Sequence, residues 1–153
     1  MSILAGFRPD SWDFPLFVHI VGAVTLVGGI LTAATFLGFA RGDSRLLRLG
    51  YWSLLAVALP GWIIMRIGAE WLYSKYDDLT PEGVDDPDWL GIGYIAADLG
   101  GLILLVSLIL GGIGVYRMRE GKGAGLLKTV LVLSIVLLAI YVVAAWAMAG
   151  KPG

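Results

Sequence analysis

The sequence contains no cysteine and a single histidine, and only 15% of its 153 residues are charged. Without cysteine the chain forms no disulfide and offers no thiolate ligand for zinc or an iron–sulfur cluster. One histidine excludes a metal site built from several histidines of the same chain. The charged fraction is well below the roughly 25% typical of soluble domains. The net charge of −1 says nothing about nucleic acid, but the Lys and Arg residues fall in short clusters rather than one large patch, so we expect no nucleic acid as a partner.

Hydrophobic residues, by contrast, make up 58% of the chain and gather in four long runs. The runs cover residues 14–39, 49–73, 90–115 and 126–148, and they are apolar on all sides rather than along one stripe. Each run is close to the ~20 residues with which a helix crosses the ~30 Å hydrocarbon core of a bilayer. We therefore predict an all-α integral membrane protein with a single transmembrane domain over residues 1–153.

The loops between these runs differ in charge, and this difference predicts the orientation of the helices. Cytoplasmic loops carry an excess of Lys and Arg. The connector over residues 74–89 holds six acidic residues and one Lys, whereas two short loops are basic. The short loops should face the cytoplasm, and both termini and the acidic loop the outside of a bacterial-type inner (plasma) membrane. The predicted fold is an antiparallel, up-down-up-down four-helix bundle. The basic residues are Arg41, Arg45, Arg48, Arg117, Arg119, Lys122 and Lys128.

Aromatic residues are expected at both membrane interfaces, where their rings reach the headgroup region. The outer set comprises Trp12, Phe14, Trp71, Tyr73, Tyr76 and Trp89, and the inner set Phe39, Tyr51, Trp52 and Tyr116.

Four ionisable residues lie inside the predicted spans: His19, Arg66, Glu70 and Asp98. A charge at bilayer depth costs a few kcal/mol or more, so it is rarely kept without a structural or functional reason. At 1.5 Å per residue, His19, Arg66 and Asp98 lie about 8, 10 and 12 Å below the outer ends of their spans, and Glu70 about 5 Å. Three helices thus bring ionisable groups to one layer. We predict a polar pocket there, in the outer half of the bilayer.

Helical spacing gives these residues their neighbours. Arg66 and Glu70 are four residues apart and can form an ion pair. His19 shares a face with small residues, on which another helix or a flat ligand could lie. That face comprises Gly22, Ala23, Leu26 and Gly29. Purely structural roles stay open: Arg66 and Glu70 as an interfacial salt bridge, His19 as a donor between helices, and Asp98 as a protonated or paired acid. A protonated His19 is one candidate partner for Asp98.

Pro60 lies in the middle of the second span. It cannot donate a hydrogen bond to the carbonyl of Ala56, so we predict a kink and a freed carbonyl at this point.

No motif of a soluble enzyme is present, which leaves three functions open. The first is binding of haem or a related cofactor, with His19 as the axial metal ligand, Arg66 and Glu70 in the pocket wall, and Asp98 as a proton-handling or ligand-orienting acid. Arg66 would pair with a propionate. A protein of this kind could be a haem-dependent membrane oxidoreductase. The second is proton-coupled transport or ion conduction through Asp98, Glu70 and His19. The third is a structural subunit, either in a homodimer or in a larger membrane complex.

The segment from Phe17 to Gly29 reads F-V-H-I-V-G-A-V-T-L-V-G-G. It resembles the first helix of CopD-type copper-resistance proteins and HemJ-type protoporphyrinogen oxidases, in which a histidine is followed by small residues and a G-G or W-x-G element. The resemblance implies a haem or metal role for His19 alone. HemJ-type proteins carry a tryptophan shortly after this histidine and a basic residue in a later span. This chain has Thr25-Leu26 and Asp98 instead, so the resemblance does not extend to protoporphyrinogen oxidation.

Overall fold

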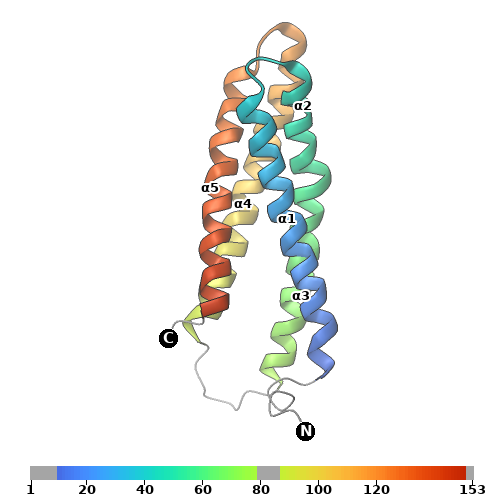
Figure 1. The fold of residues 1–153 in the computed structure, drawn as a ribbon, viewed down its shortest axis with the longest axis vertical. Helices are drawn as coiled ribbons and strands as arrows, with labels where there is room; N and C mark the ends of the chain where they lie inside the picture. Colours follow the sequence, from blue (N-terminus) through green and yellow to red (C-terminus); the bar gives the residue numbers. More distant parts are fainter. Residues whose placement is uncertain (1–9, 79–86, 151–153) are drawn as a thin grey trace.

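The computed structural model describes residues 10–78 and 87–150, and these residues form helices joined by short turns, with no strand among them (Figure 1). Four helical rods are long and apolar enough to cross a membrane, which indicates a small multi-pass membrane protein. The elements are η2 (Asp10–Trp12), α1 (Asp13–Phe39), α2 (Ser44–Ser53), η3 (Leu54–Ala58), α3 (Leu59–Asp77), α4 (Asp88–Arg117), η4 (Met118–Glu120) and α5 (Ala124–Gly150), of which α2, η3 and α3 form one continuous rod.

The helices extend beyond the predicted spans. The second rod begins at Ser44, where the side chain of Asp43 accepts a hydrogen bond of 2.8 Å from the Arg45 N–H and caps the helix. Residues 74–77 and 88–89 are also helical, so the predicted connector over residues 74–89 is too long, and residues 79–86 lie outside the described part. Hydropathy marks only the segment that crosses hydrocarbon, whereas backbone hydrogen bonding continues into the interfacial region.

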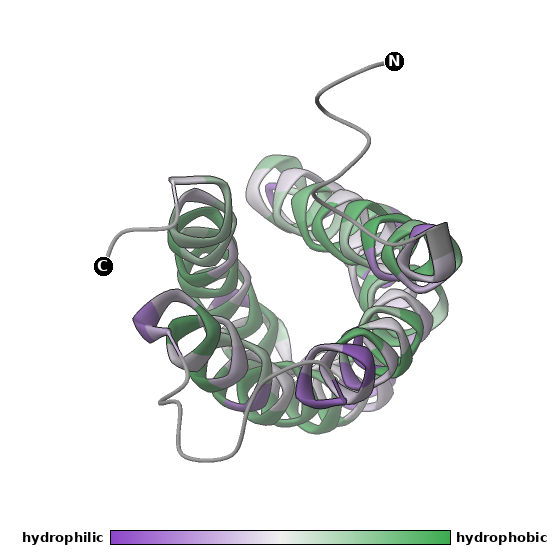
Figure 2. Cartoon of the chain, turned by 90° about the horizontal axis from the view of Figure 1, so that it is seen from below, coloured by the Kyte–Doolittle hydropathy of each residue, from purple (hydrophilic) through white to green (hydrophobic). Residues whose placement is uncertain are grey.

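The rods lie side by side, and they pack most extensively in two pairs, α1 with α3 and α4 with α5. The first residues of α1 and α4 and the last residues of α3 and α5 lie together at the lower end in Figure 1. Seen from that end, the helices form an open arc whose members are hydrophobic along most of their length (Figure 2). Large apolar side chains on the outer surface are more than half exposed, as expected of residues that face lipid; they include Phe14, Val24, Leu102 and Val142.

Glycines bring α1 and α3 into backbone contact. A Cβ at Gly68 would lie 2.5 Å from the backbone N of His19, and one at Gly61 2.5 Å from the N of Leu26. In α1, a Cβ at Gly29 would lie 2.6 Å from the backbone N of Ala58, the last residue of η3. Such small-residue contacts let two membrane helices approach closely enough for extensive van der Waals packing.

Just before Pro60, where a kink and a freed Ala56 carbonyl are predicted, the structure has a π-helical turn, and the kink itself stays a prediction. Residues Leu54–Ala58 adopt this wider turn, and the Leu59 N–H donates to the carbonyl of Leu54, five residues earlier. A wider turn gives the proline ring room against the carbonyls that precede it. At the start of the turn, Ser53 Oγ donates a 2.8 Å hydrogen bond to the Gly29 carbonyl and ties this rod to α1.

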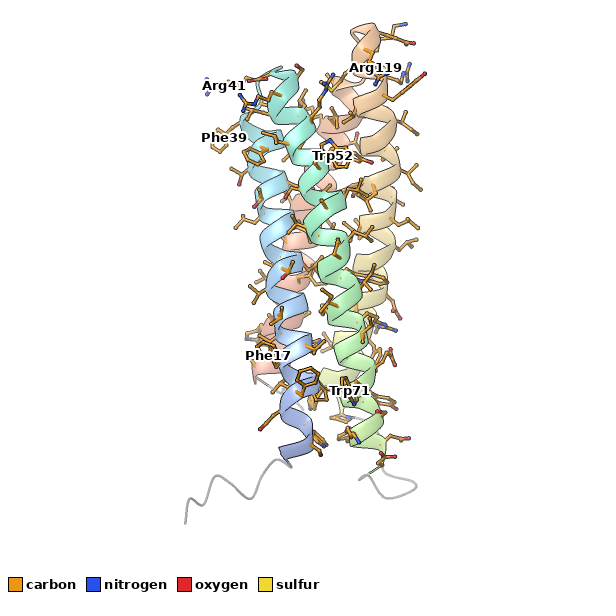
Figure 3. The ribbon with its side chains drawn as sticks, turned by 90° about the vertical axis from the view of Figure 1, so that its right-hand side faces the viewer. Phe17, Phe39, Arg41, Trp52, Trp71 and Arg119 are labelled. Atoms are coloured by element: carbon orange, nitrogen blue, oxygen red, sulfur yellow. The ribbon has the colours of Figure 1, made fainter. Side chains whose placement is uncertain are left out.

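Aromatic and basic residues mark the two ends of the bundle. Figure 3 shows Phe17 and Trp71 toward the lower end and Phe39 and Trp52 toward the upper end. Arg41 and Arg119 also lie at the upper end. This distribution agrees with two aromatic interfaces and one basic end; which end faces the cytoplasm stays a prediction.

Candidate functional site

A polar and aromatic seam joins α3 to α4 in the lower part of the bundle. Four residues of α3 spaced three or four apart share one face of that helix. Trp62 Nε1 donates a 3.0 Å hydrogen bond to the carbonyl of Ala97, and its indole ring lies against Gly101, where a Cβ would come within 2.5 Å of the ring. We call this contact the α3–α4 seam; it comprises Trp62, Arg66, Glu70 and Tyr73 of α3 and Tyr94, Ala97, Asp98 and Gly101 of α4.

Arg66 is shared by two carboxylates within this seam. Its Nη2 lies 3.1 Å from Oε1 of Glu70, four residues along the same helix, and its Nη1 lies 3.0 Å from Oδ1 of Asp98 on α4. We call these three residues the Arg66 triad. The triad carries two negative charges and one positive charge when all members are ionised, so its net charge is −1.

The guanidinium is the most enclosed member of the triad. Its side chain is 26% exposed, against 53% for Glu70 and 64% for Asp98. Arg66 Cζ also lies 5.0 Å from the centroid of the Tyr94 ring, within the range of a cation–π interaction. Nη1 is buried, and its N–H bonds are not aligned on Asp98, so that contact is an ion pair without a well-directed hydrogen bond. The N–H groups of Nη1 therefore have no aligned acceptor among the described residues.

His19 lies at the same level but at the α1–α3 contact. Its Nδ1 is 3.0 Å from the backbone carbonyl of Met65, the residue before Arg66. A carbonyl only accepts, so Nδ1 carries the hydrogen and Nε2 is the ring nitrogen left for another partner. No ion pair or hydrogen bond within the described residues joins His19 to the triad. The structure pairs Asp98 with Arg66 rather than with His19.

The small-residue face of α1 next to His19 is covered by α3. Gly22 abuts the backbone of Met65, and Gly29 abuts that of Ala58. Of the two occupants predicted for this face, a helix or a flat ligand, the structure places a helix there. The reason is that glycine and alanine offer both helices a close backbone contact at little steric cost.

An open groove of about 770 Å³ lies beside the triad, at the lower end of α3 and α4. Two acidic and two tyrosine side chains reach it, together with an apolar wall. Glu70 belongs both to the groove and to the triad. The lining consists of Glu70, Tyr73, Pro87, Asp88, Leu90, Gly91, Ile92, Tyr94 and Ile95. The sequence analysis did not single out Asp88, because it placed that residue in the acidic connector, whereas Asp88 is the first residue of α4 and lines the groove.

Among the described residues, no three His, Asp or Glu side chains are grouped so as to hold a metal ion. His19 thus belongs to no such group of three within the described ranges. Comparisons with known protein families, with curated proteins and with solved structures find no match to the chain. The first-helix resemblance of His19 consequently stays a prediction.

Proposed function

We propose that this small membrane protein transports or conducts protons or other monovalent cations, and that the Arg66 triad binds the cation. The observation that carries the proposal is the sharing of one guanidinium by two carboxylates, at positions that the sequence predicts to lie within the bilayer. Uncompensated charge in a low-dielectric region is costly, and intramembrane acids commonly mark ion pathways and proton relays. A triad with net charge −1 becomes neutral when it takes up one proton or one monovalent cation.

Cation uptake would also alter the contact between two helices. Arg66 and Glu70 both belong to α3, whereas Asp98 belongs to α4. Protonation of Asp98 would remove the charge that attracts Arg66 across the seam and leave Arg66 with Glu70 alone. The occupancy of the triad would then change how tightly α3 and α4 are held together. A ligand shifts a conformational equilibrium only if it binds the two conformations with different affinity, and the contact between α3 and α4 would supply that difference. His19 contacts the carbonyl of Met65, the residue before Arg66, but lies outside the triad, so we assign it no charge-carrying role here.

The test is a flux assay with the purified protein in liposomes. An imposed pH or cation gradient should drive flux through the wild type, and Asp98→Asn should reduce it at least about tenfold, the effect of roughly 1.4 kcal/mol on a rate. Glu120→Gln removes an acid at the opposite end of the bundle and should leave the flux unchanged. Absence of flux in the wild type, or equal flux in Asp98→Asn, would contradict the proposal. If the protein is instead a structural subunit, we expect no flux in the wild type and a fixed partner that co-purifies with it.

A second candidate, binding of haem or a related cofactor, is favoured by the geometry of His19. Metal-ligating histidines usually donate the other ring N–H to a carbonyl or carboxylate, as Nδ1 does here to Met65. Nε2 of His19 would bind the iron, and the buried Nη1 of Arg66 would donate to a propionate. Haem would supply electron transfer. The fit is incomplete, because both carboxylates already neutralise Arg66 and α3 covers the small-residue face.

An absorbance spectrum separates this candidate from the first. Protein purified after haem-sufficient expression should show a Soret band that His19→Ala removes. Absence of the band, or the same band in His19→Ala, would exclude His19 as the axial ligand. Asp98→Asn should leave the band in place, since Asp98 does not contact His19.

A further inference from the structure

The groove at the lower end of α3 and α4 combines aromatic rings, carboxylates and an apolar wall. Its volume of about 770 Å³ is large enough for a small-molecule site, and the groove is open on one side. Such sites usually bind their ligands through apolar surface and a few well-placed polar groups. The residues of this groove therefore indicate the chemical class of a ligand.

Two tyrosines form a corner in the groove. The rings of Tyr73 and Tyr94 stand at 82° to each other with centroids 5.6 Å apart, so their planes form two perpendicular walls. Aromatic faces attract cations, and perpendicular rings can surround one from two sides. The protein already uses this property once, because Tyr94 holds the guanidinium of Arg66 at 5.0 Å.

The charge of the lining residues, like the tyrosine rings, favours a cation over an anion. Glu70 and Asp88 are acidic, and none of the described residues that line the groove is basic. Arg66, which is paired with the groove residue Glu70, is already engaged by Glu70 and Asp98. A cation in the groove would compete with Arg66 for Glu70 and gain a second carboxylate in Asp88. An anion would meet two negative side chains.

The apolar wall of the groove favours a cation with a hydrocarbon body over a bare metal ion. Leu90, Ile92 and Ile95 supply hydrocarbon surface to the groove. A bare metal ion gains nothing from such a wall, and no set of three acidic or histidine ligands is grouped for it among the described residues. A cation with a hydrocarbon body satisfies the tyrosines, the carboxylates and the wall together.

We infer that the groove binds a monovalent organic cation, such as a quaternary ammonium or phosphonium ion with an apolar body. This inference deepens the proposed function and rests on it for the role of Glu70, which links the groove to the Arg66 triad. A cation bound to Glu70 would leave Arg66 with Asp98, so groove occupancy and triad protonation act on the same guanidinium.

The test uses tetraphenylphosphonium as the probe and isothermal titration calorimetry of the wild-type protein in detergent. Tetraphenylborate, an anion of nearly the same shape, measures apolar partitioning. The cation should bind saturably with one site per chain, and the anion should not. Glu70→Gln should raise Kd at least about tenfold, the equivalent of roughly 1.4 kcal/mol. Tyr73→Leu should weaken binding similarly, whereas Tyr73→Phe should retain it because the ring remains.

Matched controls at the other end of the bundle are Glu120→Gln and Tyr116→Leu, both of which should bind as the wild type does. Equal affinity for the anion, or unchanged affinity in both Glu70→Gln and Tyr73→Leu, would overturn the inference. If Tyr73→Leu fails to fold, the test is whether tetraethylammonium displaces the probe from the wild type. Displacement supports binding of an organic cation in the groove, and lack of displacement contradicts it. The flux assay is independent: saturable binding without flux upholds the groove and contradicts the transport proposal, whereas flux without saturable binding does the reverse.

Discussion

At the scale of single residues, the placement of Arg66 explains how three charged groups coexist in an apolar helix pair. Exposed ion pairs in water contribute about 0–1 kcal/mol, but removing one partner of an enclosed pair is costlier because it leaves an uncompensated charge. Arg66 is the only basic residue of the triad and the most enclosed of the three. The triad should therefore depend more strongly on Arg66 than on either acid.

This asymmetry predicts a specific pattern of stabilities. Arg66→Gln leaves Glu70 and Asp98 without a counter-charge and should lower the free energy of unfolding by about 1–2 kcal/mol, discounted for the partial exposure of all three side chains. Adding Asp98→Asn to Arg66→Gln should recover part of the loss, although Asp98→Asn alone destabilises or is neutral. Thermal unfolding in detergent, followed by circular dichroism, gives the three values. If the double variant is as unstable as the sum of the singles, the two residues do not act as a pair.

Tyr141 presents a second residue-scale case. Its side chain is 6% exposed, and its hydroxyl has no hydrogen-bond partner among the described residues. The hydroxyl packs directly against Gly100 of α4. An unsatisfied buried polar group costs about 1–3 kcal/mol, so its removal should be favourable. Tyr141→Phe is expected to unfold at the same temperature as the wild type or a few degrees higher. A clear loss of stability would mean that the hydroxyl has a partner, such as a bound water molecule.

At the scale of elements, glycine placement decides which helices touch. Gly28 and Gly29 are neighbours in α1 but point in different directions. A Cβ at Gly29 would lie 2.6 Å from the N of Ala58, whereas a Cβ at Gly28 meets nothing within 4 Å. The second glycine is thus needed for helix contact, and the first is not.

The pair supplies a matched experiment. Gly29→Ala should force α1 away from the second rod and destabilise the protein by about 1–3 kcal/mol, as overpacking typically does. Gly28→Ala should be neutral or stabilise by up to about 1 kcal/mol, because alanine is the better helix former. Unfolding temperatures of the two variants measured side by side give the comparison. Equal effects at both positions would show that the close approach of α1 is not required.

The sequence pattern predicted some of these features and left others out, for identifiable reasons. Four spans follow from the apolar runs, and the Arg66–Glu70 pair follows from their i, i+4 spacing. The depth estimated at 1.5 Å per residue placed Asp98 in the same layer as Arg66 and His19. Its ion-pair partner, however, depends on which helices are neighbours, and the periodicity of the sequence does not show which helices pack together. The contact of α1 with α3 places His19 against Met65 and leaves Asp98 to Arg66. The groove was not predicted, because two of its lining residues belong to α3 and the other seven lie at residues 87–95, and only the α3–α4 seam brings the two groups together.

At the scale of the whole molecule, charge is distributed unequally between the two ends of the bundle. Seven basic residues lie in or beside the two short connections, at the end where Figure 3 shows Arg41 and Arg119. The other end carries the groove with its two acids. Basic loops are retained on the cytoplasmic side during insertion, so the groove and the Arg66 triad should lie in the outer half of the membrane. A cation would then reach the groove from outside.

The absence of cysteine makes this orientation directly measurable, because a single introduced thiol is the only one in the chain. Ser11→Cys labels the groove end and Ser44→Cys the basic end, and both serines are exposed. In spheroplasts, a membrane-impermeant maleimide should modify Ser11→Cys at once and Ser44→Cys only after the membrane is permeabilised. Labelling of Ser44→Cys in sealed spheroplasts would invert the orientation and place the groove on the cytoplasmic side. Equal labelling of both would indicate dual insertion, with half of the grooves facing each way. The outcome decides from which side the cation in both proposals must come, because the triad lies nearer the groove end than the basic end along α3.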